Sequence, residues 1–414
     1  MAENKDKKVL NVPPLRFQEF TEEWERCKVS ELLDFYSTNS LCWEQLEYDT
    51  NAMMNLHYGL IHVGLPTMVD LAKDKLPNIK EDNMPKNFEL SKEGDVAFAD
   101  ASEDTNEVAK AIEFYNLARK TVVCGLHTIH GRDNKHKTVV GFKGYAFSST
   151  AFHNQIRRIA QGTKIYSIST KNFSECYIGL PSKPEQTKIA TLFRLIDERI
   201  STQNKIIEDL KKLKSAIIDY AINSLDTDFA KFGSLYETAG EGGTPTTSNT
   251  SFYDNGKIPF VKIDDLKQKY LTENKDFITE LGLQKSSAWL VPTRSILFSN
   301  GASIGEITIT TYPVCTKQGI LGIVPKSNID VEFLYYFMSS TYFKKAISRI
   351  VTEGTMKTAY LKDINNILCP IPTKEKQQGI AKMPSDMNSK IDYEQSLLKL
   401  FIMQKQYLLR QMFI

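Results

Sequence analysis

The chain has 414 residues, of which 41% are hydrophobic and 25% charged. This is the composition of an ordinary globular protein with room for two to four domains. The first twelve residues are polar, and no segment approaches the ~18–20 apolar residues of a membrane span, so neither a signal peptide nor a membrane anchor is expected. Six scattered cysteines form no Cys-x-x-Cys pair, which argues against a zinc site or a disulfide framework and favours the cytoplasm.

The net charge of +2 conceals a segregation of charge along the first module, predicted over residues 1–180. Residues 71–118 hold six Lys or Arg and eleven Asp or Glu, whereas residues 121–164 hold seven Lys or Arg, one Asp and four His. A basic stretch after an acidic one predicts a face that binds an anion. Uneven surface composition is the alternative interpretation.

The basic stretch supplies the candidate nucleic-acid contacts of the first module. They are His127, Thr128, His130, Arg132, Asn134, Lys135, Lys137, Arg157 and Arg158. His127 and His130 could suggest a metal, but no further Cys or His has ligand-like spacing, so no metal site is predicted. A solvated loop is the alternative for any one of these residues.

A long helix is predicted over residues 181–225. Ser182 and Glu185 have the spacing of a capping box, and Pro184 falls in the first turn. A heptad stripe follows, made of Ile189, Phe193, Ile196, Ile200, Gln203, Ile207, Leu210, Lys214, Ile217 and Ala221. No glycine interrupts it, so the helix would run for roughly 60 Å.

The second module is predicted over residues 226–371, and like the first it mixes strands with short helices. Phe98 and Phe298 match inside apolar strand-like runs of the two modules. Polar loops flanked by glycines suit close approach to a ligand. The candidate DNA contacts in these loops are Thr244, Asn300, Ser303, Lys317 and Gln318.

A second helix is predicted over residues 372–414. Its apolar stripe comprises Ile380, Met387, Ile391, Leu398, Phe401, Leu408 and Met412. Pro384 should kink or interrupt this helix near its start, and Ser385 could cap a restart.

Residues 145–223 and 336–414 are two copies of one segment, which align without a gap so that Tyr145 matches Tyr336. The chain is therefore built twice, as a module followed by a helix. The predicted fold class is α/β (α+β), with two globular domains joined by two long helices in an antiparallel coiled coil. The alternative is that each helix packs on its own module as core.

Motifs of catalysis are not found in the sequence. It has no P-loop, no Gly-rich strand–turn–helix for a dinucleotide or S-adenosylmethionine, and no GxSxG, HExxH or carboxylate–lysine nuclease cluster. This favours a binding protein over a catalyst.

Several short motifs, in their order along the chain, carry a family resemblance. They are Val12-Pro13-Pro14-Leu15-Arg16-Phe17 with Phe20 and Trp24, Gly242–Pro245, Gly256–Pro259, Asn300–Gly305, Phe333–Phe337, and the repeated Pro-(Ser/Thr)-Lys-x-x-Gln at 181–186 and 372–377. Together with the repeat they span nearly the whole chain. The chain resembles the specificity subunits of type I restriction-modification systems.

The resemblance implies two target-recognition domains that each read one half of a split, asymmetric DNA sequence. The helices would set the gap between the halves and dock two modification (methyltransferase) subunits, and restriction (motor-nuclease) subunits would complete the complex. Helix residues expected to serve partner binding are Ile189, Phe193, Ile196, Ile200, Ile207, Leu210, Ile380, Met387, Ile391, Leu398 and Phe401. The resemblance further implies that S-adenosylmethionine, ATP and Mg²⁺ bind to the partner subunits and that this chain holds no cofactor. The chain is expected to be non-catalytic by itself. It is expected in the cytoplasm of a bacterium or an archaeon.

The sequence departs from the family pattern in the first module, which lacks a Gly-Gly-Thr-Pro turn and whose Leu126–Lys137 stretch aligns with nothing in the second. The two domains are therefore predicted to read different sequences. A coiled-coil adaptor between two protein partners is the main alternative function, and a self-contained restriction enzyme is the third. The target bases depend on loop geometry and cannot be read from the sequence.

Overall fold

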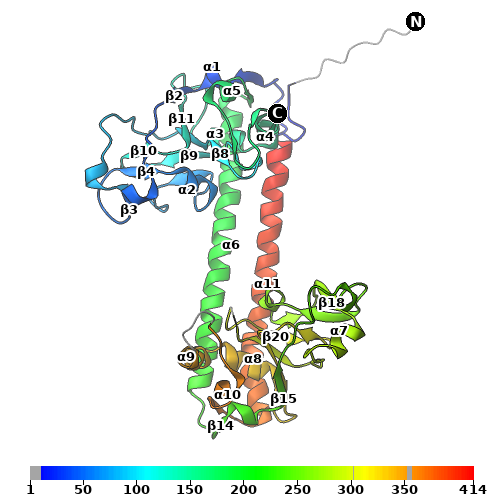
Figure 1. The fold of residues 1–414 in the computed structure, drawn as a ribbon. Helices are drawn as coiled ribbons and strands as arrows, with labels where there is room; N and C mark the ends of the chain where they lie inside the picture. Colours follow the sequence, from blue (N-terminus) through cyan, green and yellow to red (C-terminus); the bar gives the residue numbers. More distant parts are fainter. Residues whose placement is uncertain (1–10, 302, 352–356) are drawn as a thin grey trace. The chain divides into compact units, whose positions relative to one another are not determined.

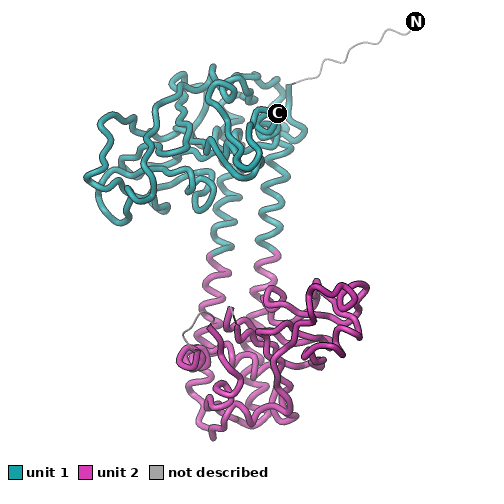
Figure 2. The backbone as a smooth tube through the Cα atoms, in the orientation of Figure 1, with its two compact units in different colours: residues 1–204, 397–414 teal, residues 205–396 magenta. Residues whose placement is uncertain are grey.

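A computed structural model describes residues 11–301, 303–351 and 357–414. The polar residues 1–10 and Ala302, inside the Asn300–Gly305 motif, lie outside the described residues. The chain forms two compact units, unit 1 from residues 1–204 and 397–414 and unit 2 from residues 205–396 (Figure 2). None of the described helices is long and apolar enough to cross a membrane.

Unit 1 contains a five-stranded sheet. In spatial order its strands are β2 (Asp34–Tyr36), β11 (Thr128–Arg132), β7 (Val96–Ala99), β9 (Ala111–Asn116) and β5 (Met68–Asp70). Strand β7 is buried on both faces: Val96 and Phe98 enter one hydrophobic core, whereas Ala97 and Ala99 enter another. Successive side chains of a strand point to opposite faces, so this sheet lies between two apolar layers.

Smaller elements surround this sheet. A four-stranded sheet follows the order β10 (Val122–Cys124), β4 (Met54–Leu56), β6 (Asn78–Ile79) and β3 (Leu46–Glu47). Two-stranded pairs join β1 (Glu25–Lys28) with β13 (Tyr177–Leu180) and β8 (Ala101–Ser102) with β12 (Tyr166–Ser167). The short helices are α1 (Val29–Leu32), α2 (Tyr58–His62), α3 (Lys143–Phe147), α4 (Thr150–Ile159) and α5 (Thr170–Ser174), with 3-10 turns at Trp43–Gln45 and Glu81–Asn83.

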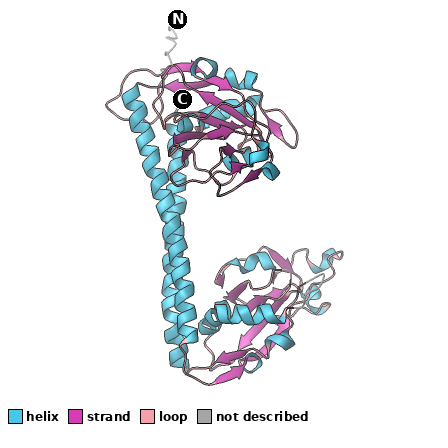
Figure 3. Cartoon of the chain, turned by 90° about the vertical axis from the view of Figure 1, so that its left-hand side faces the viewer, coloured by secondary structure: helices cyan, strands magenta, loops and turns pink. Residues whose placement is uncertain are grey.

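Unit 2 also contains a five-stranded sheet with smaller sheets and short helices, and the helices and strands of the chain are distinguished by colour in Figure 3. Its five-stranded sheet has the order β15 (Tyr236–Glu241), β22 (Ile320–Pro325), β19 (Ile296–Ser299), β20 (Ile307–Thr310) and β17 (Tyr270–Leu271). The other strands are β18 (Asp276–Ile278), β16 (Ile258–Val261) and β21 (Cys315–Thr316) in one sheet, and β14 (Phe229–Lys231) with β23 (Leu368–Pro370) in another. Helices are α7 (Glu280–Gln284), α8 (Val331–Ser339), α9 (Thr341–Ile350) and α10 (Leu361–Ile364), with 3-10 turns at Phe232–Ser234, Thr250–Phe252 and Ile263–Lys267.

Equivalent residues start equivalent elements in the two units. Strands β7 and β19, which carry Phe98 and Phe298, are each the third strand of their sheet, so the predicted match is confirmed. Ser149 caps α4 by accepting a hydrogen bond from the Phe152 amide at 3.2 Å. Ser340, its equivalent in the second copy of the repeat, caps α9 in the same way.

The two long helices are α6 (Lys183–Asn223, green in Figure 1) and α11 (Lys374–Gln411, red). In unit 1 they pack antiparallel, with Lys405 Nζ 2.6 Å from Asp197 Oδ1 and the ring centroids of Phe193 and Phe413 5.7 Å apart. Phe193 is completely buried. The predicted fold class, with its antiparallel pair of long helices, is confirmed.

The repeated glutamine of the Pro-(Ser/Thr)-Lys-x-x-Gln motif ties each helix start to its module. Gln186 accepts a hydrogen bond from the Val139 amide at 2.9 Å, and Gln377 accepts one from the Asp330 amide at 2.7 Å. The Glu185 carboxylate receives two hydrogen bonds of 2.7 Å from Arg16. The expected capping-box glutamate is therefore engaged by the N-terminal segment.

The predicted interruption of the second helix at Pro384 does not occur, because α11 is continuous from Lys374 to Gln411. A proline inside a helix removes one hydrogen bond of the ladder, and tertiary contacts can offset that loss. Pro384 is buried. The Ser385 hydroxyl does not cap a new helix but lies 2.9 Å from Lys269 Nζ and 3.1 Å from the Tyr336 hydroxyl.

A polar cluster fixes the helix pair against the module in unit 1. The Tyr145 hydroxyl donates to Asp197 Oδ2 at 2.9 Å, and Lys405 pairs with the other oxygen of the same carboxylate. A polar group inside a helix–helix seam specifies register because a shifted pairing would leave it without a partner.

The equivalent positions of the repeat form a cluster in unit 2. Asn388 donates to the Tyr336 hydroxyl at 2.9 Å, and Lys214 donates to the Asn388 amide oxygen at 2.7 Å. The polar interruption of the heptad stripe at Lys214 is thus the seam contact of unit 2. The second copy of the repeat carries an amide where the first carries a carboxylate.

Candidate nucleic-acid interface

The basic stretch predicted as one DNA-binding surface is divided by strand β11. His127 precedes the strand, residues 128–132 form it and are all buried, and residues 133–138 follow it. Five residues of extended chain span roughly 17 Å at about 3.4 Å per residue. Of the candidate contacts in this stretch, Thr128, His130 and Arg132 therefore lie within a buried strand, whereas His127 lies at one of its ends and Asn134, Lys135 and Lys137 beyond the other.

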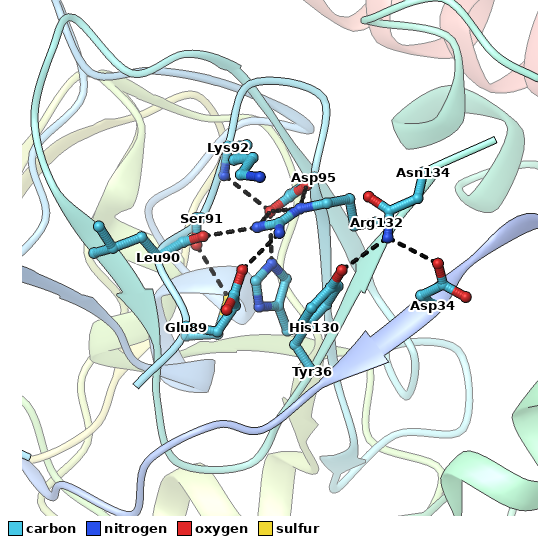
Figure 4. A network of polar contacts seen from close by, with 11 residues as sticks. Asp34, Tyr36, Glu89, Leu90, Ser91, Lys92, Asp95, His130, Arg132 and Asn134 are labelled. Carbon is cyan, nitrogen blue, oxygen red and sulfur yellow. Dashed lines mark hydrogen bonds and ion pairs between the residues drawn. The ribbon is translucent and has the colours of Figure 1, made fainter. Parts of the chain in front are cut away.

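Arg132 belongs to a buried charge network inside the first module (Figure 4). Its three nitrogens donate to Asp95, to Glu89 and to the Leu90 carbonyl at distances of 2.6–3.2 Å. His130 Nε2 lies 2.7 Å from Asp95 Oδ2 and is completely buried. Burial alone would raise the pKa of Asp95, but hydrogen bonds from His130 and Arg132 outweigh it and lower that pKa.

Thr128, His130 and Arg132, which were predicted to contact DNA, are therefore buried inside the first module. Thr128 is also buried, and its hydroxyl donates to the Gly125 carbonyl at 2.6 Å. Buried charges need partners, and the donors of Arg132 are engaged within the protein. The sequence could not separate a basic run on a surface from one passing through a sheet.

The side chains beyond β11 also have partners within the first module. Asn134 donates to Asp34 and to the Tyr36 hydroxyl at 2.8 Å each. The Lys135 ammonium donates to the Glu31 carbonyl at 2.8 Å, and that of Lys137 pairs with Glu25 at 2.9 Å. These contacts are exposed or half-exposed, so their role in DNA binding stays a prediction.

At the other end of β11, two loops meet in loop cluster 1, defined as residues 100–105 and 125–127. The Asp100 amide donates to the His127 carbonyl at 3.1 Å, and the Ile168 amide donates to the Asp100 carbonyl at 3.0 Å. The Gly125 amide donates to the Leu56 carbonyl at 2.9 Å. Backbone hydrogen bonds thus join the two loops to each other, to the segment of Ile168 and to the end of β4.

Loop cluster 2 in the second module comprises residues 242–245, 300–305 without Ala302, and 316–319. The Gln318 amide donates to the Thr244 hydroxyl at 3.3 Å, and the Asn300 amide donates to the Gly319 carbonyl at 3.0 Å. The Ser303 carbonyl accepts a hydrogen bond from the Ser299 hydroxyl. The structure thus places the predicted residues Thr244, Asn300, Ser303, Lys317 and Gln318 in one set of adjoining loops.

The two loop clusters are topologically equivalent. Asp100 follows β7 as Asn300 follows β19, and the Asp100–His127 backbone bond recurs as Asn300–Gly319. The Ile168 contact recurs in Ala359, its equivalent in the second copy of the repeat, whose amide donates to the Asn300 carbonyl at 2.9 Å. The expectation that Leu126–Lys137 has no counterpart is therefore corrected: it matches the segment from Gln318 through β22. Only the three-dimensional pairing shows this, because the residues differ.

The two remaining arginine candidates lie on α4. Arg157 donates to Asn106 at 2.8 Å and to Asn154. Arg158 is exposed and has no polar partner among the described residues. Its counterpart in the repeat, Arg349 on α9, is likewise exposed and unpaired within the described ranges. Among the described residues, nothing competes with an external anion for these two arginines.

The helix residues predicted to bind partners are buried or half-buried within the chain. Ile189, Phe193, Ile207 and Ile391 are at most 6% exposed. A different apolar set faces outward, made of Leu195, Leu400, Met403 and Tyr407 in unit 1 and Leu213, Tyr220, Met383 and Tyr393 in unit 2, each 52–77% exposed. The heptad stripe thus serves intramolecular packing. In unit 1, Leu400, Met403 and Tyr407 are spaced three and four residues apart on α11 and form an outward apolar stripe that the periodicity alone did not single out.

Within the described ranges, no three or more His, Cys, Asp or Glu side chains are grouped so that they could hold a metal ion. His127 and His130 fall on different sides of their segment: the first is half-exposed and the second is buried against Asp95.

A family model for the type I restriction modification DNA specificity domain matches residues 114–212 and 226–400. These ranges make up more than half of the chain, so the chain belongs to this family. The MjaIX specificity subunit of Methanocaldococcus jannaschii is 31% identical over 173 residues, 40% of this chain and 39% of that one. The EcoR124I/EcoR124II specificity subunit of Escherichia coli is 24% identical over 52% of this chain and 56% of its own. The chain thus matches less than two thirds of these relatives.

Solved structures share the fold. The S subunit of a type I restriction-modification system from M. genitalium has a TM-score of 0.54 at 17% identity, covering 97% of this chain and 99% of that one. A chain from a structure of type I restriction-modification complex assembly has a TM-score of 0.61 at 15% identity, covering 93% and 96%. At these identities the likeness concerns architecture alone.

Proposed function

We propose that this chain is the DNA sequence-recognition subunit of a type I restriction-modification complex. Each module reads one half of a bipartite, asymmetric DNA target through its loop cluster, and helices α6 and α11 set the spacing between the halves. The observation that carries the proposal is the presence of two equivalent loop clusters, one in each module, built on a duplicated module-and-helix plan. Their different side chains suit an asymmetric target.

In the proposed complex the helices dock two modification subunits, and restriction subunits join them. The methyl donor S-adenosylmethionine, and the ATP and Mg²⁺ of translocation and cleavage, belong to those partners. The chain itself supplies binding and positioning without chemistry. It works in the cytoplasm, where the DNA and its partners are found.

The test is reconstitution of the chain with its own modification subunits, followed by mapping of methylated bases in cells that carry the complex. We expect one bipartite motif with two different half-sites and a fixed gap. The adaptor hypothesis instead predicts assembly without sequence-specific DNA binding. A complex that binds all DNA sequences equally at every salt concentration would contradict the proposal.

Arg158 and Arg349 are expected to contact DNA phosphates. Because both are exposed and lack a partner among the described residues, replacing both with Ala should lower the slope of log affinity against log salt by about two units. The comparison pair replaces Lys135 and Lys137, which have internal partners and whose own role in DNA binding is still a prediction. A slope that falls for the lysine pair and stays unchanged for the arginine pair would contradict this prediction. It would show that the DNA lies at the end of β11 that Lys135 and Lys137 follow.

The outward apolar stripe is expected to dock the modification subunits. Introducing Glu at Leu400 and Met403, which are 60% and 53% exposed, places charge in the proposed interface without touching the helix seam. Co-purification with the modification subunit should fall at least tenfold, while the thermal unfolding of the isolated chain stays the same. Lys399 and Gln404, exposed on the same helix, supply a control pair for substitution to Glu. Undiminished co-purification of the apolar variant would exclude this stripe.

A further inference from the structure

His127 occupies a backbone conformation that side chains rarely adopt. Its φ is 53°, in the left-handed region, at the turn between β10 and β11. A non-glycine residue there carries strain that persists only where the surroundings enforce it, and such residues gather at functional sites. The side chain is half-exposed, so it is not held there by burial.

The imidazole of His127 has a fixed orientation. Its Nδ1 lies 3.1 Å from Asp100 Oδ1, and its ring makes a T-shaped contact with the Tyr58 ring at a centroid distance of 5.2 Å. Because a carboxylate only accepts hydrogen bonds, Nδ1 carries the proton in this pair. In the neutral ring, Nε2 then presents a lone pair away from Asp100.

The equivalent place in the second module is built differently. Gly319 stands where the first module has His127, at a φ of 89°, and among the described residues no side chain lies within 4 Å of a Cβ built on it. Asn300, the counterpart of Asp100, is only 2% exposed, and its Oδ1 has no partner among the described residues. The first module thus carries an imidazole at position 127, hydrogen-bonded to Asp100. The second carries a glycine at 319 beside Asn300, whose Oδ1 has no donor among the described residues. A difference of this kind between equivalent positions is expected of a specificity determinant.

We propose that His127 is a specificity-determining residue of the first module. Its Nε2 accepts a hydrogen bond from the exocyclic amino group of an adenine or a cytosine, displayed in the major groove. The inference rests on the proposed function and deepens it. In the tautomer with the proton on Nδ1, Nε2 has no proton to donate to a phosphate, and the Asp100 carboxylate repels a phosphate.

The first experiment replaces His127 with Gly in the reconstituted complex. Glycine suits the positive φ and occurs at the equivalent position, so the variant should fold. Discrimination should fall on the order of tenfold at one base pair of one half-site, with the other half-site unchanged. The matched control is His136→Gly, since His136 is also exposed with a φ of 52° but lies beyond the far end of β11. Equal effects of both variants, or no effect of either, would overturn the proposal.

The second experiment assigns the contacted group. Each adenine or cytosine of the half-site is exchanged in turn for an analogue without its exocyclic amino group. One position should cost the unmodified complex about tenfold in affinity and cost the His127→Gly complex nothing. A guanine is tested in the same way with 7-deazaguanine, which lacks the N7 acceptor. If affinity that depends on His127 is lost there instead, Nε2 donates a hydrogen bond, and its assignment as an acceptor is wrong. Absence of any sequence preference in the unmodified complex would refute the proposed function itself, which keeps the two failures distinct.

Discussion

Replacing Arg132 with Met is expected to destabilise unit 1 by about 3–5 kcal/mol, because the change leaves Asp95 and Glu89 as buried or half-buried carboxylates without their cation. The aliphatic stem of Met retains part of the packing, so the loss comes mainly from unpaired charge. Asp95 is 1% exposed and cannot regain water in the folded state.

The measurement is thermal unfolding of the purified chain, in which the transition of unit 1 should move down by about 6–20 °C. Arg119→Met is the matched control, since Arg119 is exposed and has no polar partner among the residues that the structure describes. Adding Asp95→Asn and Glu89→Gln to the Arg132 variant should recover part of the loss. If the Arg132 variant unfolds at the same temperature as the unsubstituted chain but binds DNA weakly, Arg132 contacts DNA, as the sequence first predicted.

The architecture of this protein was largely predictable because duplication leaves a signal independent of local propensity. The ungapped alignment of the two copies located both helices and their equivalent starts, now explained by Gln186 and Gln377. The same alignment joins Lys214 to Lys405 and Tyr145 to Tyr336, which are seam contacts in the structure. The recurrence of a lysine at equivalent positions of the two stripes, 214 and 405, is the signal in the sequence that indicates these polar clusters.

The candidate site was less predictable, for a physical reason. A run such as Thr128–Arg132 carries the same charges whether it lies on a surface or crosses a sheet, and its burial depends on Asp95, which is distant in the sequence. The equivalence of His127 and Gly319 could not be predicted from the sequence, because it rests on matching backbone hydrogen bonds from Asp100 and Asn300 and not on similar residues. The second module's segments were identified as loops because glycine-flanked turns mark strand ends directly, whereas their adjacency appears only in the structure.

Under the proposed function, a matched insertion of four residues in each long helix should widen the gap between the two half-sites by one to two base pairs. Four helical residues add about 6 Å, and DNA advances about 3.4 Å per base pair. In α6 the insertion belongs between Glu208 and Ser215, after Leu210. The Lys214–Asn388 contact and the antiparallel direction place the matching point in α11 after Ile391.

Both helices must be lengthened because each unit packs on both. In unit 1 Phe193 of α6 contacts Phe413 at the end of α11, and in unit 2 Lys214 contacts Asn388. An insertion in α6 alone would displace one of these contacts by about one turn. Four residues are close to the 3.6 of a full turn, so each module keeps nearly its original orientation about the helix.

The readout is the methylated motif of cells that carry the variant with its modification subunits. A control of unchanged length replaces four exposed residues of the stretch 208–215 with the inserted ones and should leave the gap as it was. If helix length sets the spacing, the bases read in each half-site stay the same while their separation grows, because the loop clusters are untouched. Intact methylation of the original gap by the lengthened chain would show that the modules position themselves on DNA independently of the helices.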